Sequence, residues 1–220
     1  VGILFERGRQ RFNTIHTEGA ANVARAAKAQ GARLVHVSAI GADENSTSSY
    51  ARSKAAAEHV IREIVPEATI MRPSIMFGPE DNFFNLFASL ARMSPFLPLI
   101  GGGHTRFQPV FVGDVAQAIA RAVDGEARAG TTYELGGPEV RTFREILEYI
   151  LKTTERRRLL VPLPFLLAKL QASLMQFMPT PLLTPDQVEL LRTDNVVSQE
   201  VMTQQRTLQG LGITTPEPIE

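Results

Sequence analysis

The chain has 220 residues, 23 basic and 23 acidic side chains, and 44% hydrophobic residues. This length and apolar content suffice for one domain, or for a domain with a small lobe. A formal net charge of zero argues against a nucleic-acid-binding surface, which needs a basic field. The sequence has no cysteine, which excludes disulfides and thiolate chemistry, and its four scattered histidines predict no metal site.

Strands and helices are predicted to alternate along the first part of the chain. Apolar spacing and turn residues indicate a helix over 13–30, a strand over 33–38, a helix over 50–65 and a strand over 68–73. This strand–helix–strand order implies parallel strands joined by crossover helices.

The same alternation continues to about residue 150. We expect a helix over 83–92, an extended segment over 107–112, a helix over 113–123, a strand over 131–135 and a helix from 142. Asp114 is the expected N-cap of the 113–123 helix. Thr142 with Glu145 is a capping-box pattern.

The last seventy residues have a different pattern. A helix is predicted from about residue 164 to 178, with one apolar side formed by Leu166, Leu167, Leu170, Leu174 and Phe177. It is too short and too polar on its other side to span a bilayer. The apolar side is expected to pack against the protein or a partner, or to lie on a membrane. Another helix is expected near 185–193, followed by a loosely ordered polar tail.

The most informative residues are Ser38, Tyr50 and Lys54. Ser38 ends a predicted strand, and Tyr50 and Lys54 lie four residues apart at the start of the next predicted helix, so both can face the same way. A phenol ordinarily titrates near pH ~10, and a nearby ammonium favours its ionised form. The trio resembles the reaction centre of nicotinamide-dependent oxidoreductases, and this resemblance predicts such a centre here. A surface helix with an exposed Tyr and Lys is the alternative.

These residues and several motifs resemble the extended short-chain dehydrogenase/reductase superfamily, which includes NAD-dependent epimerases and dehydratases. The resemblance covers most of the first 150 residues and includes Arg72-Pro-Ser-Ile-Met-Phe-Gly-Pro79 and Pro109-Val-Phe-Val-Gly-Asp-Val-Ala116. It implies catalytic roles for Tyr50, Lys54 and Ser38. It also implies that the cofactor is bound by Gly2, Ser38, Tyr50, Lys54, Pro73, Ser74 and Ile75.

Motifs in the last third resemble a narrower branch, the NAD(P)-binding accessory subunits of respiratory complex I and their bacterial relatives. The motifs are Val161-Pro-Leu-Pro-Phe165, Pro181-Leu-Leu-Thr-Pro-Asp-Gln-Val188 and Asp194-Asn-Val-Val-Ser198. This resemblance implies a largely structural nucleotide and an assembly at a membrane.

The sequence also departs from the superfamily pattern. No glycine-rich phosphate loop occurs, so we expect an N-terminally truncated chain that lacks the first half of the nucleotide-binding fold. His16 stands where the superfamily often has an active-site Asn. Phe107, with Arg106 beside it, stands where sugar-nucleotide epimerases carry an Arg. Both changes weaken the epimerase interpretation.

The combined expectation is a partial Rossmann-like α/β fold with a parallel sheet and a small, helical C-terminal lobe. Residues 1–140 are assigned to the C-terminal part of the NAD(P)-binding domain with interleaved segments of the substrate lobe, and 141–220 to a mostly helical C-terminal lobe and tail. The expected function is that of a complex I accessory-subunit-like protein. An NAD(P)-dependent oxidoreductase or epimerase acting on a small or isoprenoid-like substrate is the alternative.

The expected cofactor is NAD or NADP, with NADP preferred. The expected partners are this nucleotide and subunits of a membrane complex, without nucleic acid. The expected location is cytoplasmic and peripheral on the inner membrane, without a transmembrane helix.

Overall fold

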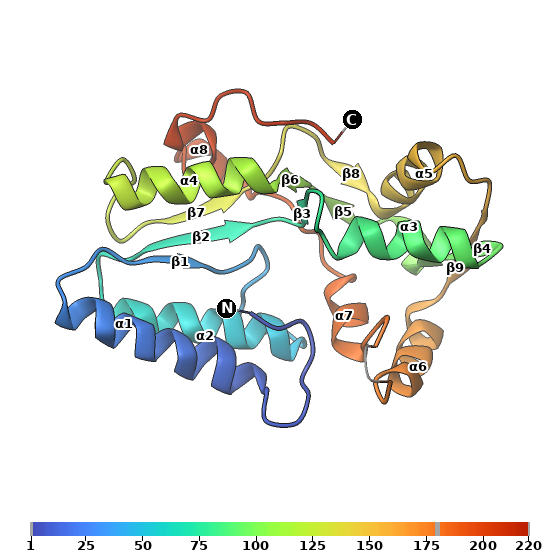
Figure 1. Ribbon diagram of the computed structural model, residues 1–220, viewed down its shortest axis with the longest axis horizontal. Helices are drawn as coiled ribbons and strands as arrows, with labels where there is room; N and C mark the ends of the chain where they lie inside the picture. Colours follow the sequence, from blue (N-terminus) through green and yellow to red (C-terminus); the bar gives the residue numbers. More distant parts are fainter. Residues whose placement is uncertain (1, 179–180, 220) are drawn as a thin grey trace.

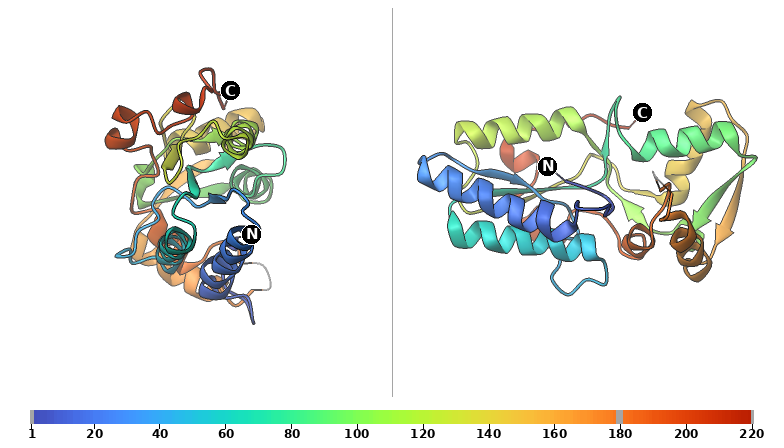
Figure 2. Two further views of the ribbon diagram at one scale, coloured as in Figure 1. Left: turned by 90° about the vertical axis from the view of Figure 1, so that its left-hand side faces the viewer. Right: turned by 60° about the horizontal axis from the view of Figure 1, so that its bottom comes forward.

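The computed structural model describes residues 2–178 and 181–219, and a three-stranded parallel sheet lies at its centre (Figure 1). The strands β1 (Val35–Val37), β2 (Thr69–Pro73) and β7 (Thr132–Leu135) lie in the order β1-β2-β7. Helices α1 (Gly19–Ala29) and α2 (Ser49–Ile64) cover one face, and α4 (Val112–Asp124) covers the other (Figures 1 and 2). This arrangement confirms the predicted α/β class with a parallel sheet.

A second lobe lies beyond the carboxyl ends of these strands (Figure 1). It contains the helices α3 (Phe83–Met93), α5 (Phe143–Thr153), α6 (Phe165–Met175) and α7 (Pro185–Leu190). Strands β4 (Phe96–Ile100) and β9 (Leu159–Leu163) form a parallel pair in it. Sequence patterns did not predict this pair. Pro98 and Pro162 interrupt both runs, and proline is tolerated because each strand has a single partner among the described residues.

Two pairs of short strands join the sheet to the lobe. Strand β3 (Met76–Phe77) pairs in parallel with β6 (Val110–Phe111), and β5 (Arg106–Phe107) pairs antiparallel with β8 (Arg141–Thr142). The extended segment predicted over 107–112 corresponds to β5 and β6. These short pairs fix the lobe at the edge of the sheet where the functional residues lie.

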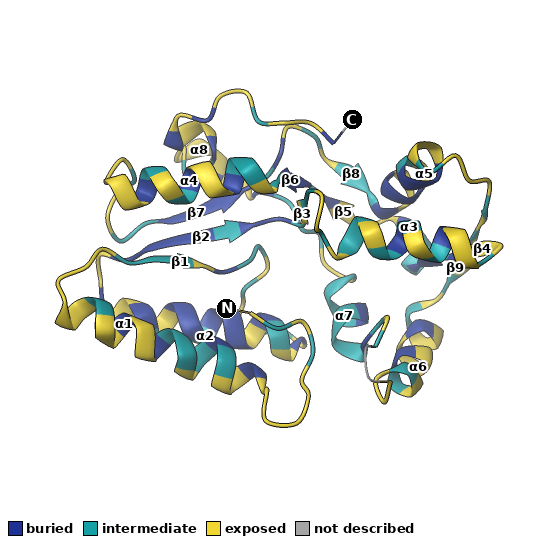
Figure 3. Ribbon diagram, viewed as in Figure 1, coloured by how far each residue is buried: buried dark blue, intermediate teal, exposed yellow. Residues whose placement is uncertain are grey.

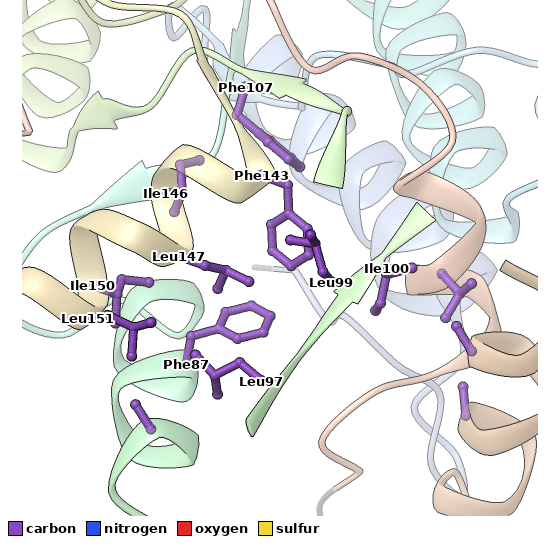
Figure 4. Packing of buried hydrophobic residues seen from close by; sticks show 14 residues of the cluster. Phe87, Leu97, Leu99, Ile100, Phe107, Phe143, Ile146, Leu147, Ile150 and Leu151 are labelled. Carbon is purple, nitrogen blue, oxygen red and sulfur yellow. The ribbon is translucent and has the colours of Figure 1, made fainter. Parts of the chain in front are cut away.

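Apolar side chains gather in separate cores, and Figure 3 shows the buried stretches along the sheet and inside the lobe. The lobe core contains Phe87, Leu97, Leu99, Phe143 and Leu147, all 8% exposed or less (Figure 4). Its aromatic rings contact one another edge to face, with 5.4 Å between the centroids of Phe87 and Phe143. Such interlocked rings make the lobe wall rigid.

The predicted N-terminal cap is correct for helix α5 and wrong for helix α4. Thr142 accepts from the Glu145 amide at 3.2 Å and the Glu145 carboxylate accepts from the Thr142 amide at 2.6 Å, which confirms the capping box. Asp114 is not the N-cap of α4: that position is Phe111, and Asp114 lies in the first turn. Its carboxylate instead accepts from the amide of Glu217, so it anchors the C-terminal segment.

The helix predicted over 13–30 is continuous, but its first part, Asn13–Glu18, is a π-helix that precedes α1. The expectation of a loosely ordered tail is wrong. Helix α8 (Gln199–Thr203) and a 3-10 turn at Gln209–Leu211 follow the lobe, and Leu208, Leu211 and Ile213 are buried in the core beneath α4. The tail is polar on average, so its composition does not reveal these few apolar residues. Their burial holds the tail against the core.

Helix α6 agrees with the predicted 164–178 helix, and its leucines face outward. Ala168 and Ala172 are fully buried, whereas Leu166, Leu170 and Leu174 are 78%, 62% and 70% exposed. Among the described residues, no helix combines the length and the apolar content that crossing a bilayer requires.

Candidate functional site

A cavity of about 1360 Å³ lies at the carboxyl ends of β1 and β2 and extends into the lobe. This exceeds the roughly 300–1,000 Å³ typical of a single small-ligand pocket. All seven residues predicted from the sequence line it, namely Gly2, Ser38, Tyr50, Lys54, Pro73, Ser74 and Ile75. The fold thus brings together residues that are far apart in the chain.

Ser38 and Lys54 are both buried beside the end of β1. Ser38 is 4% exposed, and its Oγ is buried without a hydrogen-bond partner among the described residues. Lys54 is 7% exposed, and its Nζ donates to the carbonyl of Val37 at 2.9 Å. A buried polar atom without a partner is costly, so an oxygen or nitrogen of a ligand in the cavity fits the Ser38 hydroxyl.

Burial shifts the pKa of Tyr50 and that of Lys54 in opposite directions. It raises the pKa of the Tyr50 phenol, because the anionic phenolate is poorly solvated there. It also lowers the pKa of Lys54, and the Glu58 carboxylate partly opposes that shift. The expectation that Lys54 lowers the pKa of Tyr50 is therefore wrong, because burial is the cause of the shift and acts upward. Tyr50 remains a protonated hydrogen-bond donor at neutral pH.

The turn after β2 lines the cavity, but its polar groups are already used within the protein. The Ser74 hydroxyl donates to Asn195 Oδ1 at 2.7 Å, and the Ile75 amide donates to the same oxygen at 3.1 Å. The Ser74 amide donates to the Leu135 carbonyl at 2.9 Å. This turn therefore offers mainly carbon surface to a ligand.

His16 does not replace the family's Asn as a cavity residue; it supports the helix that carries Tyr50. Its Nε2 accepts from the Ile3 amide at 3.0 Å, which places the proton on Nδ1, and Nδ1 lies 2.8 Å from Ser53 Oγ. The Ser53 hydroxyl donates to the Tyr50 carbonyl at 2.7 Å. Burial, assisted by the charge of Lys54, lowers the pKa of His16 to about 4, so the ring is neutral.

Sequence reasoning missed Asp186, which fixes the first turn of α2 from a distant part of the chain. Its carboxylate accepts from the Ser48 hydroxyl at 2.8 Å, the Ser49 amide at 2.6 Å and the Tyr50 amide at 3.2 Å. An anion at a helix N-terminus is favourable because the first amides lack partners within the helix. Asp186 belongs to the Pro181–Val188 motif, which was the available signal.

Asn195 connects the loops that follow β1 and β2. Its Oδ1 accepts from Ser74 and Ile75, and its Nδ2 donates to the Ile40 carbonyl at 3.2 Å. Nearby, the Ser198 amide donates to the Glu134 carboxylate at 2.8 Å. The Asp194–Ser198 motif thus braces the strand ends, and its first two residues also line the cavity.

Two arginines near the site are held by carboxylates. Arg72 makes a two-pronged pair with Glu58 at 2.8 and 2.7 Å, so it connects β2 to α2. Arg106 donates to Asp194 through its side chain at 2.8 Å, with a second contact at 2.7 Å. Arg106 is therefore paired within the protein, and it is not among the residues that line the cavity.

Comparison with known proteins yields close matches over most of the chain. The mitochondrial NADH dehydrogenase (ubiquinone) 1 alpha subcomplex subunit 9 of Arabidopsis thaliana is 41% identical over 214 residues, covering 92% of this chain and 53% of that protein. The subunit of the same name from Mus musculus is 35% identical over 201 residues, covering 90% of this chain and 52% of that protein. The chain spans about half the length of these relatives.

Solved structures share the fold. DesIV, a dTDP-glucose 4,6-dehydratase from Streptomyces venezuelae solved with NAD, has a TM-score of 0.60 at 25% identity, over 69% of this chain and 54% of that one. The structure named gox2253 has a TM-score of 0.70 at 19% identity, over 99% of this chain and 73% of that one. The model of the RmlD substrate binding domain matches residues 5–209. The chain therefore belongs to the RmlD substrate-binding-domain family, within the NAD(P)-binding extended short-chain dehydrogenase/reductase superfamily.

Proposed function

We propose that this chain provides the nicotinamide–ribose part of an NAD(P) site in a protein of the complex I accessory-subunit type, where the nucleotide is largely structural. The observation that carries the proposal is that a buried Lys54 and a half-buried Tyr50 line the same cavity as the Ser38 hydroxyl, which has no partner among the described residues. A general base works best when its pKa lies near the operating pH, and burial moves the pKa of Tyr50 away from it.

Each residue of the trio has a binding role in this proposal. Lys54 donates to the ribose hydroxyls, since the Val37 carbonyl is its one hydrogen-bond partner among the described residues and the ammonium has further protons to donate. Tyr50 and Ser38 donate to an oxygen next to the nicotinamide ring. Gly2, Pro73, Ser74 and Ile75 contribute surface around it. A bound nicotinamide would itself supply any hydride transfer.

An oxidoreductase or epimerase is the second candidate, favoured by the complete trio and the available Ser38 hydroxyl. The engagement of Arg106 by Asp194 argues against a sugar nucleotide as its substrate. The raised pKa of Tyr50 argues against efficient proton abstraction. The preference for NADP over NAD remains a prediction, tested by comparing NADPH with NADH.

We also propose that the exposed leucines of α6 attach the protein to an apolar surface of a membrane-complex subunit, peripheral on an inner membrane. Large exposed apolar patches mark interaction sites. Lys169, the basic residue of this helix, pairs with Glu189 at 3.2 Å, which leaves little positive charge for anionic lipid. A protein partner is therefore favoured over a charged lipid surface.

Titration with reduced nicotinamide mononucleotide, followed by ligand-observed NMR, tests the nucleotide proposal. We expect saturable binding by the 220-residue chain, with an affinity close to that for NADPH, because the sequence contains no glycine-rich cradle for the pyrophosphate. Lys54→Ala should abolish binding, whereas the exposed control Lys28→Ala should not. Tight NADPH binding, or equal binding by wild type and Lys54→Ala, contradicts the proposal.

A further inference from the structure

The cavity has two chemically different ends. Near β1 and α2 it is lined by Ser38, Tyr50 and Lys54, and in the lobe it is lined by apolar side chains that include Phe83, Phe87, Phe107, Phe143, Val161 and Leu163. We call this second part the apolar arm. Phe87, Phe107 and Phe143 are 8% exposed or less and belong to the lobe core, so the arm has a rigid wall (Figure 4).

The charges around the cavity disfavour an anionic ligand in the apolar arm, away from Lys54. Among the described residues that line it, Lys54 and Arg192 are the two cations, against five carboxylates that include Glu80, Asp81 and Glu189. Arg192 is already paired with Glu189 at 3.3 Å and lies 4.6 Å from the Phe165 ring centroid. A phosphate or carboxylate in the arm would therefore lack a partner and meet net negative charge.

The volume and the polar end together suggest the shape of the ligand. The cavity, at about 1360 Å³, has room for a second molecule beside a nicotinamide ribose. The Ser38 hydroxyl, buried and unpartnered, suits a neutral oxygen. Beyond it the arm offers mainly hydrocarbon contact, from its aromatic and aliphatic side chains.

We propose that the apolar arm binds a neutral amphiphile with one long hydrocarbon chain, whose carbonyl or hydroxyl oxygen lies against Ser38 and Tyr50. The inference rests on the proposed function, because the head group is placed beside the proposed nicotinamide site. It concerns binding alone and needs no chemical step.

A series of methyl ketones from 2-hexanone to 2-dodecanone tests the ligand class by ligand-observed NMR titration. Because each buried methylene adds a nearly constant free energy, we expect the affinity to rise about fourfold per methylene until the arm is filled. Affinity that does not depend on chain length would overturn the proposal, as would tighter binding of UDP-glucose than of 2-dodecanone.

Matched variants locate the binding to the arm. Val161 lines the cavity and is 44% exposed, whereas Leu159, two residues earlier on β9, is 74% exposed and does not line it. Val161→Asp should weaken 2-dodecanone binding at least about tenfold, since a charge replaces apolar contact. Leu159→Asp should leave it unchanged. Leu182→Asp, at another partly exposed lining residue, should repeat the effect of Val161→Asp. Equal effects of the Val161 and Leu159 changes would overturn the proposal.

The same samples separate this inference from the proposed function. Binding of reduced nicotinamide mononucleotide without length-dependent ketone binding would overturn the apolar-arm proposal alone. Length-dependent ketone binding without mononucleotide binding would overturn the nucleotide proposal and leave the arm as a binding site.

Discussion

The polar centre around Ser38, Tyr50 and Lys54 and the apolar lobe are held together in different ways. The polar centre depends on hydrogen bonds from distant residues such as Asp186 and Asn195. The lobe depends on interlocked aromatic and aliphatic side chains. The segment from Pro185 to Asn195 serves both, because Val188 is buried in the lobe core while Asp186 caps α2. A change in this segment should therefore affect the polar centre even where the lobe core is untouched.

The lobe core should give the largest loss of stability. Phe143 is fully buried against Phe83, Phe87 and Phe107. Phe143→Ala should reduce the free energy of unfolding by about 3–5 kcal/mol through lost burial and a residual cavity. Urea unfolding measures it, with the half-exposed Val140→Ala as the control. A loss below about 1 kcal/mol would mean that the lobe collapses around the gap.

Acid should act on the polar centre rather than on the lobe. The pKa of His16 in the folded chain is about 4, below its ordinary value of 6.5. Between these values the unfolded chain binds more protons, so the free energy of unfolding falls as pH is lowered through this window. The loss is on the order of 2–3 kcal/mol for His16 when the window has been crossed.

Urea unfolding at pH 7 and pH 4.5 checks this pH dependence. His36 is expected to contribute in the same direction, since burial and the charge of Lys54 lower its pKa to about 4. His16→Gln should reduce the pH dependence, whereas His59→Gln, at an exposed position on α2, should leave it unchanged. Unaltered pH dependence in His16→Gln would show that the ring is not buried in neutral form.

Removing the Asp186 carboxylate tests whether the C-terminal segment fixes the helix of Tyr50. Asp186→Ala removes an acceptor for three donors and should cost about 2 kcal/mol, within the range for helix caps and charged hydrogen bonds. It should also weaken mononucleotide binding. Asp114→Ala is the control, since Asp114 lies in the first turn of α4. Equal mononucleotide affinity in wild type and Asp186→Ala would contradict the assigned role.

The outer face of the lobe should show the smallest effect on stability. Leu170 and Leu174 are 62% and 70% exposed, so replacing both with Ser should barely change the melting temperature. If this face attaches the protein to a subunit of a membrane complex, the double variant should no longer be found in the membrane fraction. Retention in that fraction would show that another surface is responsible.

The sequence predicted the sheet and the trio because both depend on local patterns. An apolar run ending in Ser38 and the Tyr50–Lys54 spacing are visible without tertiary information. Strands β4 and β9 could not be found in this way, since their prolines resemble a loop and their pairing spans more than sixty residues. The roles of Asp186 and Asn195 likewise depend on contacts between residues 120 to 155 positions apart along the chain, from the Ile75–Asn195 bond to the Ile40–Asn195 bond. Burial, which sets the pKa of Tyr50, is also a property of the folded chain.

Amide hydrogen exchange at Ile75 tests most directly whether the C-terminal segment assembles the polar centre. The Ile75 amide donates to Asn195 Oδ1 at 3.1 Å, in the turn that lines the cavity. In Asn195→Ala, we predict at least about tenfold faster exchange at Ile75, while the amides of α4 keep their protection. Unchanged protection at Ile75 would contradict the account, because the turn would then hold its shape without the segment.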